Sequence, residues 1–278
     1  MSWPRIEPCH VQRTTFEKKF RISSPSDFVS NLATANIIDW FDGNKNDFLT
    51  YADSASTHLI NKIIRASKPL GELSDVQLGV TPYQLTDTPS HKNSKPAFNG
   101  TVRRYLFDFG EKKFIRFDDS LAELKPEKYF LGKRLLLREL ISRQFQLQCV
   151  KVGSDFVTNK SMQSILPDEN GYDLNYLLGF INSKLMSWYF LHRSNIAQRD
   201  DFPKNVLKET RSLPIYPVNL SNAKDKVKYE QMISYVETIL TSQSKLLKGN
   251  SEQEKLNHQR QIEATDRQID ALVYQLYG

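Results

Sequence analysis

The chain has 278 residues, of which 39% are hydrophobic and 25% are charged, and its net charge at pH 7 is +6. This composition is typical of a globular protein and excludes a disordered chain, while the length allows one large domain or two modest ones. There is no apolar run of about 18 residues and no signal peptide at the start, so neither a membrane nor secretion is indicated. Cys9 and Cys149 lie far apart in the sequence, which favours a reducing, cytoplasmic location.

Residues 1–65 are predicted to form a helical connector that packs on another part of the protein. Apolar residues recur at helical spacing over 28–41, and Gly43-Asn44 ends this pattern. A second helix is predicted over 54–65, with an apolar side that includes Ile60 and Ile63.

Residues 66–217 change character and are predicted to form a β-rich domain. Short runs rich in Phe, Val, Ile, Tyr and Leu alternate with turn signals such as Asn99-Gly100. The predicted strands are 76–80, 102–109, 113–117, 134–140, 145–151 and 156–166. We expect a curled mixed or antiparallel β-sheet, and the fold class as a whole is expected to be α+β.

A strongly apolar helix is predicted over Tyr172–Phe190, within the same domain. Asp173 is a suitable N-cap, and the apolar residues that follow share one broad face. The polar stretch Asn182-Ser183-Lys184 interrupts this face, and Gly179 is expected to let another backbone approach closely.

Residues 218–278 are predicted to form two helices that break at Gly249-Asn250-Ser251. In the second helix the apolar residues Ile262, Ile269 and Leu276 are seven positions apart, as in a coiled-coil seam. We expect an antiparallel pair that braces the β-rich domain, although ordinary amphipathic surface helices would give the same pattern.

The order of these elements resembles a known family. The stretch YLLGFINSKLMSWYF followed by LPIYP is similar to the TaqI-like C-terminal specificity domain. That domain is the target-recognition part of adenine-N6 DNA methyltransferases and of type IIG restriction–methylation enzymes. Four further stretches resemble the family in the same order, namely KPLGELSDVQLGVTPYQ, FNGTVRRY, KPEKYFLGKRLLLREL and DFVTNKSMQSILP. The resemblance covers about residues 66–217 and implies sequence-specific recognition of double-stranded DNA.

The distribution of charge fits that implication. Residues 91–160 contain 15 Lys and Arg and 8 Asp and Glu, a net charge of +7 that accounts for the whole excess of the chain. Basic side chains neutralise phosphates, whereas Arg, Asn and Gln read base edges. The candidate DNA-binding residues are Tyr83, Gln84, Lys92, Asn93, Lys95, Arg103, Arg104, Arg134, Arg138, Arg143, Asn159, Lys160, Arg193 and Arg199. A solvated charged face is the alternative interpretation, and Arg193 and Arg199 also suit a helix C-terminus.

Catalytic motifs are not found. An adenine methyltransferase needs a glycine-rich donor loop and an Asn/Asp-Pro-Pro-aromatic tetrapeptide, but the sequence has neither Gly-x-Gly nor Pro-Pro. We therefore expect no catalytic or metal site in this chain alone, and S-adenosylmethionine and Mg²⁺ only in domains outside it. The histidines are scattered without cysteine partners at zinc spacing.

Three hypotheses follow. In the first, the chain is the specificity region of a type IIG or methyltransferase protein, with a methyltransferase or nuclease domain in cis. In the second, it is a free-standing specificity subunit that recruits separate methyltransferase chains through residues 218–278. In the third, Asp119, Glu123 and Lys125 form a small metal-dependent nuclease site, although Pro126 argues for a loop there.

Overall fold

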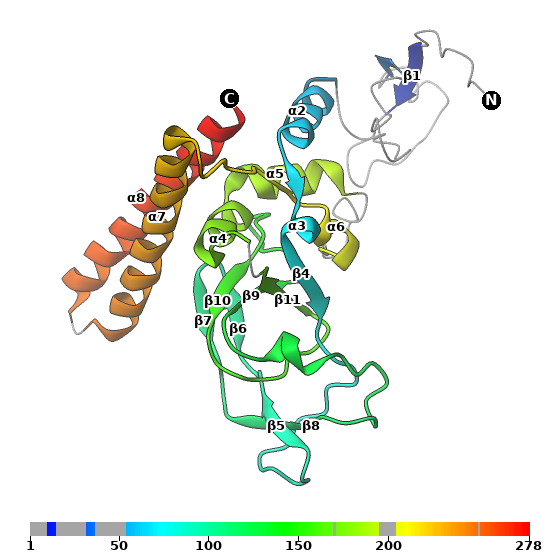
Figure 1. Cartoon of the computed structure of the whole chain (residues 1–278), viewed down its shortest axis with the longest axis vertical. Helices are drawn as coiled ribbons and strands as arrows, with labels where there is room; N and C mark the ends of the chain where they lie inside the picture. Colours follow the sequence, from blue (N-terminus) through cyan, green and yellow to red (C-terminus); the bar gives the residue numbers. More distant parts are fainter. Residues whose placement is uncertain (1–9, 15–31, 37–53, 169–170, 195–203, 250) are drawn as a thin grey trace.

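The computed structural model describes residues 54–168, 171–194, 204–249 and 251–278, together with the backbone of two short strands near the N-terminus. These strands, β1 (His10–Thr14) and β2 (Leu32–Asn36), pair antiparallel. The helix predicted over 28–41 is therefore wrong across β2, where strand pairing overrides the helical spacing of the apolar residues. The remainder of that range lies outside the described residues. The fold is α+β, as expected (Figure 1).

A four-stranded antiparallel sheet forms the centre of the molecule. Its order is β10–β9–β11–β4, and its strands are β4 (Ser74–Leu78), β9 (Arg134–Arg138), β10 (Cys149–Val152) and β11 (Met162–Pro167). Each strand was expected close to these positions. The predicted runs from 145 and 156 begin too early, because the chain forms turns before it reaches β10 and β11.

Both faces of the sheet are buried, as the uninterrupted run of leucines in β9 shows. Successive side chains of a strand point to opposite faces. Leu135 and Leu137 accordingly belong to a large core shared with the helices, whereas Leu136 belongs to a separate cluster on the other face. Because the sheet is covered on both sides, polar and apolar residues do not alternate along its central strand as they do in a half-exposed strand.

The face that carries Leu136 is covered by a small hairpin and a group of phenylalanines. The hairpin consists of β6 (Thr101–Arg103) and β7 (Leu106–Asp108). The single strand predicted over 102–109 is wrong, because the chain turns at Arg104 and Tyr105, and Tyr105 has a φ of 58°. The rings that pack together here are those of Phe98, Phe107, Phe109 and Phe156. Such a cluster gives the hairpin a rigid attachment to the sheet.

Short elements complete the β-rich part. They are the ribbon β5 (Ser94–Ala97) with β8 (Lys113–Arg116), the pair β3 (Lys68–Pro69) with β12 (Pro214–Ile215), the helices α3 (Leu70–Leu73) and α6 (Leu207–Arg211), and the 3₁₀ turn η2 (Glu127–Phe130). The β5–β8 ribbon lies at the end of the molecule opposite α2 (Ser54–Arg65), which forms as predicted (Figure 1).

The apolar helix predicted over 172–190 is divided in two at the polar interruption. α4 (Leu174–Asn182) begins at its N-cap Asp173, whose side chain accepts from the amide of Asn175, and ends at Ser183. α5 (Lys184–Arg193) begins at once, because the Ser183 side chain accepts from the amide of Met186. One serine therefore ends one helix and caps the next.

Asn182 connects this junction to the sheet. Its carboxamide is fully buried and forms two hydrogen bonds of 3.0 Å with the backbone of Cys149, accepting from its N–H and donating to its carbonyl oxygen. Cys149 opens the edge strand β10, so these backbone groups have no partner strand on that side. The Asn182 side chain supplies a partner to both groups, and the Cys149 carbonyl oxygen also accepts from the amide of Tyr105 at 3.0 Å.

The C-terminal pair forms as predicted. α7 (Ala223–Lys248) and α8 (Glu252–Tyr277) run side by side and pack on α4 (Figure 1). A Cβ added at Gly179 would lie 2.3 Å from the Met232 sulfur. The glycine therefore leaves room for a side chain of α7, and not for another backbone as expected. Among the described residues, no helix combines the length and apolar character needed to cross a bilayer.

An ion pair ties the helical pair to the β6–β7 hairpin. The Arg104 guanidinium donates to both carboxylate oxygens of Asp266 in α8, at 2.7 and 3.0 Å, and also to the carbonyl oxygen of Asn182 at 2.6 Å. Less than a fifth of either charged side chain is exposed. A two-pronged, largely buried pair of this kind fixes both distance and orientation.

We predict strong energetic coupling between Arg104 and Asp266. Each single alanine substitution should lower the free energy of unfolding, because it leaves the other charge buried without a partner. A double-mutant cycle measured by urea unfolding should give a coupling energy of about 1–3 kcal/mol. The exposed pair Lys255–Glu252 on α8 is the matched control, with an expected coupling below about 1 kcal/mol. Equal coupling in the two cycles would contradict the bracing role.

Candidate nucleic-acid interface

Four separate segments meet around one hollow in the β-rich part of the molecule. Its volume is about 260 Å³. The segments are the loop after β4, the start of the β6–β7 hairpin, the end of β9 and the turn before β11. The lining residues are Tyr83, Leu85, Phe98, Asn99, Gly100, Thr101, Val102, Arg138, Leu140, Asn159, Ser161 and Met162. Polar and apolar residues contribute to its lining in similar measure.

Six of the residues predicted from the sequence lie in this hollow or immediately beside it. Tyr83, Arg138 and Asn159 line it. Gln84, Arg103 and Lys160 are exposed and directly follow a lining residue in the chain. The fold thus gathers candidates that are up to 77 positions apart in the sequence, Tyr83 and Lys160 being the extremes.

Close backbone contact holds the 159–161 turn against the end of β4. The amide of Val80 donates to the Thr158 carbonyl at 2.8 Å, and that of Gly79 donates to Met162 at 3.0 Å. A Cβ at Gly79 would lie 2.1 and 2.2 Å from the carbonyl oxygens of Asn159 and Thr158. Only glycine permits this approach, and the approach sets the position of the Asn159 side chain.

Tyr83 supports the hollow rather than offering a free polar group. Its hydroxyl lies 2.7 Å from the carbonyl oxygen of Phe98 and 2.8 Å from that of Val157. Burial raises the pKa of the phenol above its usual value. Its hydroxyl is therefore directed to the backbone, while the contact of Tyr83 with DNA stays a prediction.

Two of the predicted arginines point inward. Arg134 is fully buried, stacks on Phe156 with 4.5 Å between its guanidinium carbon and the ring centre, and donates to the carbonyl oxygens of Gly132, Ser154 and Phe156. Burial lowers its pKa to about 10, so it remains charged at neutral pH. Arg104 is held by Asp266, as described above. Neither guanidinium is available to DNA, and the sequence-based assignment of both is corrected.

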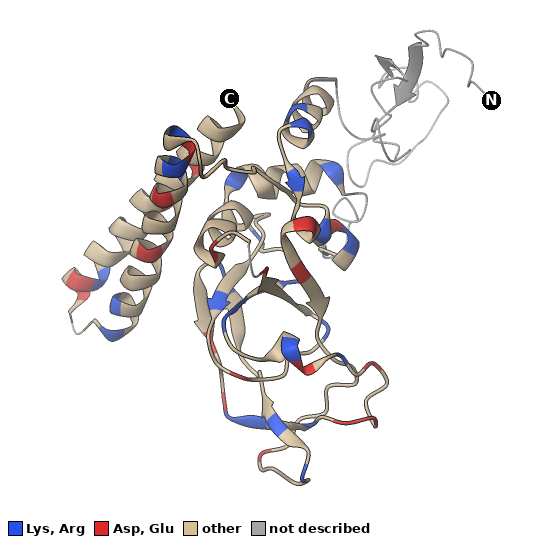
Figure 2. Ribbon diagram, in the orientation of Figure 1, with Lys and Arg blue, Asp and Glu red and all other residues tan. Residues whose placement is uncertain are grey.

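The predicted residues of the β5 region lie away from the hollow. Asn93 donates to Asp118 at 3.1 Å, and Lys95 pairs with Glu127. Lys92 is exposed, and Figure 2 shows that basic residues extend from β10 to the β5–β8 ribbon with acidic residues between them. Charge is thus spread over this part rather than confined to one element.

The last three predicted residues are also outside the hollow. Arg143 is exposed in the loop between β9 and β10, and Arg193 is partly buried at the end of α5. Arg199 lies outside the described residues.

The residues of the nuclease hypothesis do not converge on a metal-binding arrangement. Lys125 pairs with Glu123 at 3.2 Å, while Asp119 is exposed in a neighbouring turn. In the described ranges, no three His, Cys, Asp or Glu side chains are grouped in a way that could hold a metal ion.

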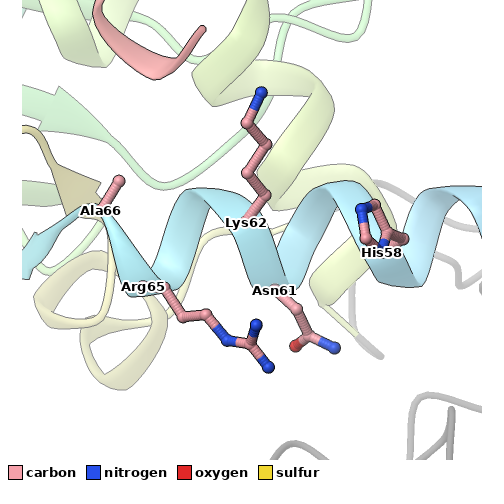
Figure 3. A pocket seen from close by; sticks show the side chains of 5 residues that line it. All are labelled: His58, Asn61, Lys62, Arg65 and Ala66. Atoms are coloured by element: carbon pink, nitrogen blue, oxygen red, sulfur yellow. The ribbon is translucent and has the colours of Figure 1, made fainter.

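A second hollow lies on α2, far along the chain from the first. It is lined by His58, Asn61, Lys62, Arg65 and Ala66. Figure 3 shows Lys62 pointing away from Arg65 and Asn61, so these polar groups do not meet at one point.

A known family matches a continuous part of this chain. The sequence model of the TaqI-like C-terminal specificity domain matches residues 95–215. Residues 95–215 are therefore similar to that domain. The matched residues include most of the first hollow and none of α2, and the resemblance predicted for residues 66–217 is confirmed over 95–215.

A curated relative from Methanocaldococcus jannaschii, "Putative type II restriction enzyme and methyltransferase RM.MjaORFECS2P", is 26% identical over 213 residues. The match covers 75% of this chain but only 17% of that protein. The chain therefore spans about a sixth of the length of this relative.

Three solved structures show limited similarity. The type IIL restriction–modification enzyme MmeI in complex with DNA gives a TM-score of 0.48 at 11% identity, over 76% of this chain and 33% of that one. The HsdS subunit from Thermoanaerobacter tengcongensis gives 0.34 at 12% identity, over 79% and 50%. A type I restriction–modification system gives 0.31 at 14% identity, over 75% and 44%. Scores of this size do not establish a common fold.

We predict that Gly79→Ala destabilises the domain, since the new Cβ would overlap two carbonyl oxygens of the 158–159 segment. The free energy of unfolding should fall by about 1–3 kcal/mol, the usual cost of overpacking. Gly153→Ala is the matched control, because a Cβ there meets nothing within 4 Å, and it should change stability by no more than about 0.5 kcal/mol. Equal unfolding midpoints for both variants in urea would refute the close approach.

Proposed function

We propose that this chain recognises a base sequence in double-stranded DNA as the specificity region of a restriction–modification protein. The observation that carries the proposal is the position of the family match. Residues 95–215 contain Arg103, Arg138, Asn159 and Lys160, which the fold brings to the rim of one hollow. A curled antiparallel sheet with such a rim offers both a rigid support and adjustable loops.

The residues around the hollow suit two different kinds of contact. Exposed Arg103 and Lys160 are placed to neutralise phosphates, which positions a protein on DNA without reading its sequence. Arg138 and Asn159 are more enclosed and carry groups that match base edges in the major groove. Gln84, beside Tyr83, is a further exposed group on the same rim.

Catalysis belongs to other domains in this proposal. The chain would need neither S-adenosylmethionine nor Mg²⁺ itself, and a methyltransferase or nuclease domain would act in cis or in trans. The relative from Methanocaldococcus jannaschii supports the arrangement in cis, because its name combines both activities in one protein. In the alternative, separate methyltransferase chains bind to α7 and α8. A DNA partner is also consistent with the expected cytoplasmic location.

We predict that Arg103 and Lys160 contribute to the salt dependence of binding. Affinity for a short duplex of random sequence, measured by fluorescence anisotropy at several salt concentrations, should fall in the double alanine variant. The slope of log K against log salt should become shallower by about 0.9 for each phosphate that the variant no longer neutralises.

The matched control is the double alanine variant of Lys245 and Lys248, which removes the same charge from the last turn of α7. Its slope should stay close to that of the unaltered chain. Identical slopes for the two double variants would show that only net charge affects binding. That result would contradict the assignment of this rim to DNA binding.

We also predict that the isolated chain transfers no methyl group. With tritiated S-adenosylmethionine and random-sequence duplex, incorporation should equal that of a reaction without protein. Addition of a methyltransferase subunit that co-purifies with the chain should restore incorporation if the arrangement is in trans. Methyl transfer by the isolated chain would contradict the proposal that catalysis belongs to other domains.

A further inference from the structure

Arg138 differs from the other enclosed arginines of the β-rich part. Arg134 and Arg104 are each held by several acceptors. Within the described ranges, the Arg138 side chain forms no hydrogen bond or ion pair, although it is partly buried and lines the hollow. The guanidinium therefore lies at the hollow with its donors unoccupied by the described residues, which places it to donate to a ligand.

The backbone of Arg138 is firmly placed. It ends β9, opposite Met162 in β11, and its amide donates to the carbonyl oxygen of Gln148 at 2.9 Å. Leu140, two residues further on, lines the same hollow. The backbone at the base of this side chain is therefore held in one position, which defines where the guanidinium can reach.

The neighbouring Asn159 also presents a donor. Its Oδ1 accepts from both the amide of Ser161 at 3.1 Å and the hydroxyl of Ser161 at 2.5 Å. This arrangement orients the carboxamide and leaves Nδ2 without a partner among the described residues. The rim thus offers the donors of Arg138 and the Nδ2 of Asn159.

Because Arg138 and the Nδ2 of Asn159 offer only hydrogen-bond donors, they favour bases that present acceptors in the major groove. Guanine presents two adjacent acceptors, O6 and N7, which a guanidinium can engage with two parallel hydrogen bonds. Adenine places an amino donor beside its N7, and cytosine presents an amino donor, so both would oppose Arg138. On the basis of the proposed function, we infer that the Arg138 guanidinium donates to O6 and N7 of a guanine in the target sequence. Asn159 would donate to an acceptor of the same or the next base pair.

A backbone phosphate fits this position less well. The more exposed Arg103 and Lys160 beside the hollow are better placed for phosphates, which stay hydrated at the edge of the grooves. The walls near Arg138 are apolar, with Val102, Leu140 and Met162 among them. Such walls exclude water from a base edge and suit contact with a thymine methyl group.

The test is a selection of duplexes from a random pool by the 278-residue chain, followed by sequencing of the bound fraction. The unaltered chain should enrich a sequence that contains at least one guanine position. Arg138→Gln should lose the preference at that one position by roughly tenfold or more, and leave the other positions unchanged. Arg138→Lys keeps the charge but lacks the planar fork, so it should also lose the preference while the salt slope stays the same.

Arg103→Gln is the matched control, and it should weaken all sequences equally without changing the enriched motif. Circular dichroism melting should show that the Arg138 variants remain folded, as expected for a side chain that bonds none of the described residues.

An unchanged motif in both Arg138 variants would overturn the inference and leave the proposed function intact. Uniform weakening with a shallower salt slope would reassign Arg138 to a phosphate and also overturn it. If the unaltered chain enriches no sequence at all, the proposed function fails together with the inference.

Discussion

The side chain of Asn182 is the contact on which the arrangement of this molecule depends. Its two hydrogen bonds to Cys149 attach α4 to the edge strand β10, and its own carbonyl oxygen accepts from Arg104. Immediately after it, Ser183 ends α4 and caps α5, and the amide of Lys184 donates to Asp270 of α8. Sheet, hairpin and both helical layers therefore meet within three residues. Because every partner here is buried or nearly so, a change in one of them would leave polar groups unsatisfied in the others.

This junction places the helices on one face of the sheet and the first hollow beside the other. The helices pack on the face that carries Leu135 and Leu137, whereas the Leu136 face packs against the β6–β7 hairpin, Phe98 and Phe156. The hairpin is shorter than the strands beneath it, and the hollow lies where it ends beside the end of β9. Rigid packing on one side thus supports loops and strand ends on the other, an arrangement common in binding proteins.

Much of this organisation was predictable, because it depends on local patterns. The central strand, the polar break at Asn182-Ser183 and the two C-terminal helices all follow from spacing and capping residues. The partners of those residues were not predictable. Nothing in the order of the chain indicates that Asn182 would bond an edge strand, or that the turn at Arg104-Tyr105 would face α8. The strand at 32–36 was missed because its pairing with β1 is not encoded in its own spacing.

Arg134 and Arg138 show most clearly which features the sequence alone does not predict. They are four residues apart on one strand, so they lie on the same face with about 13 Å between them. Their immediate sequence contexts are equally apolar, yet Arg134 finds Phe156 and three carbonyl oxygens, whereas Arg138 reaches the hollow. The difference arises because the Arg134 guanidinium lies within reach of the carbonyl oxygens of Gly132, Ser154 and Phe156, whereas no described residue accepts from the guanidinium of Arg138. The strand thus carries one arginine that is held by backbone carbonyl oxygens and another that lines the hollow, and only the tertiary structure distinguishes them.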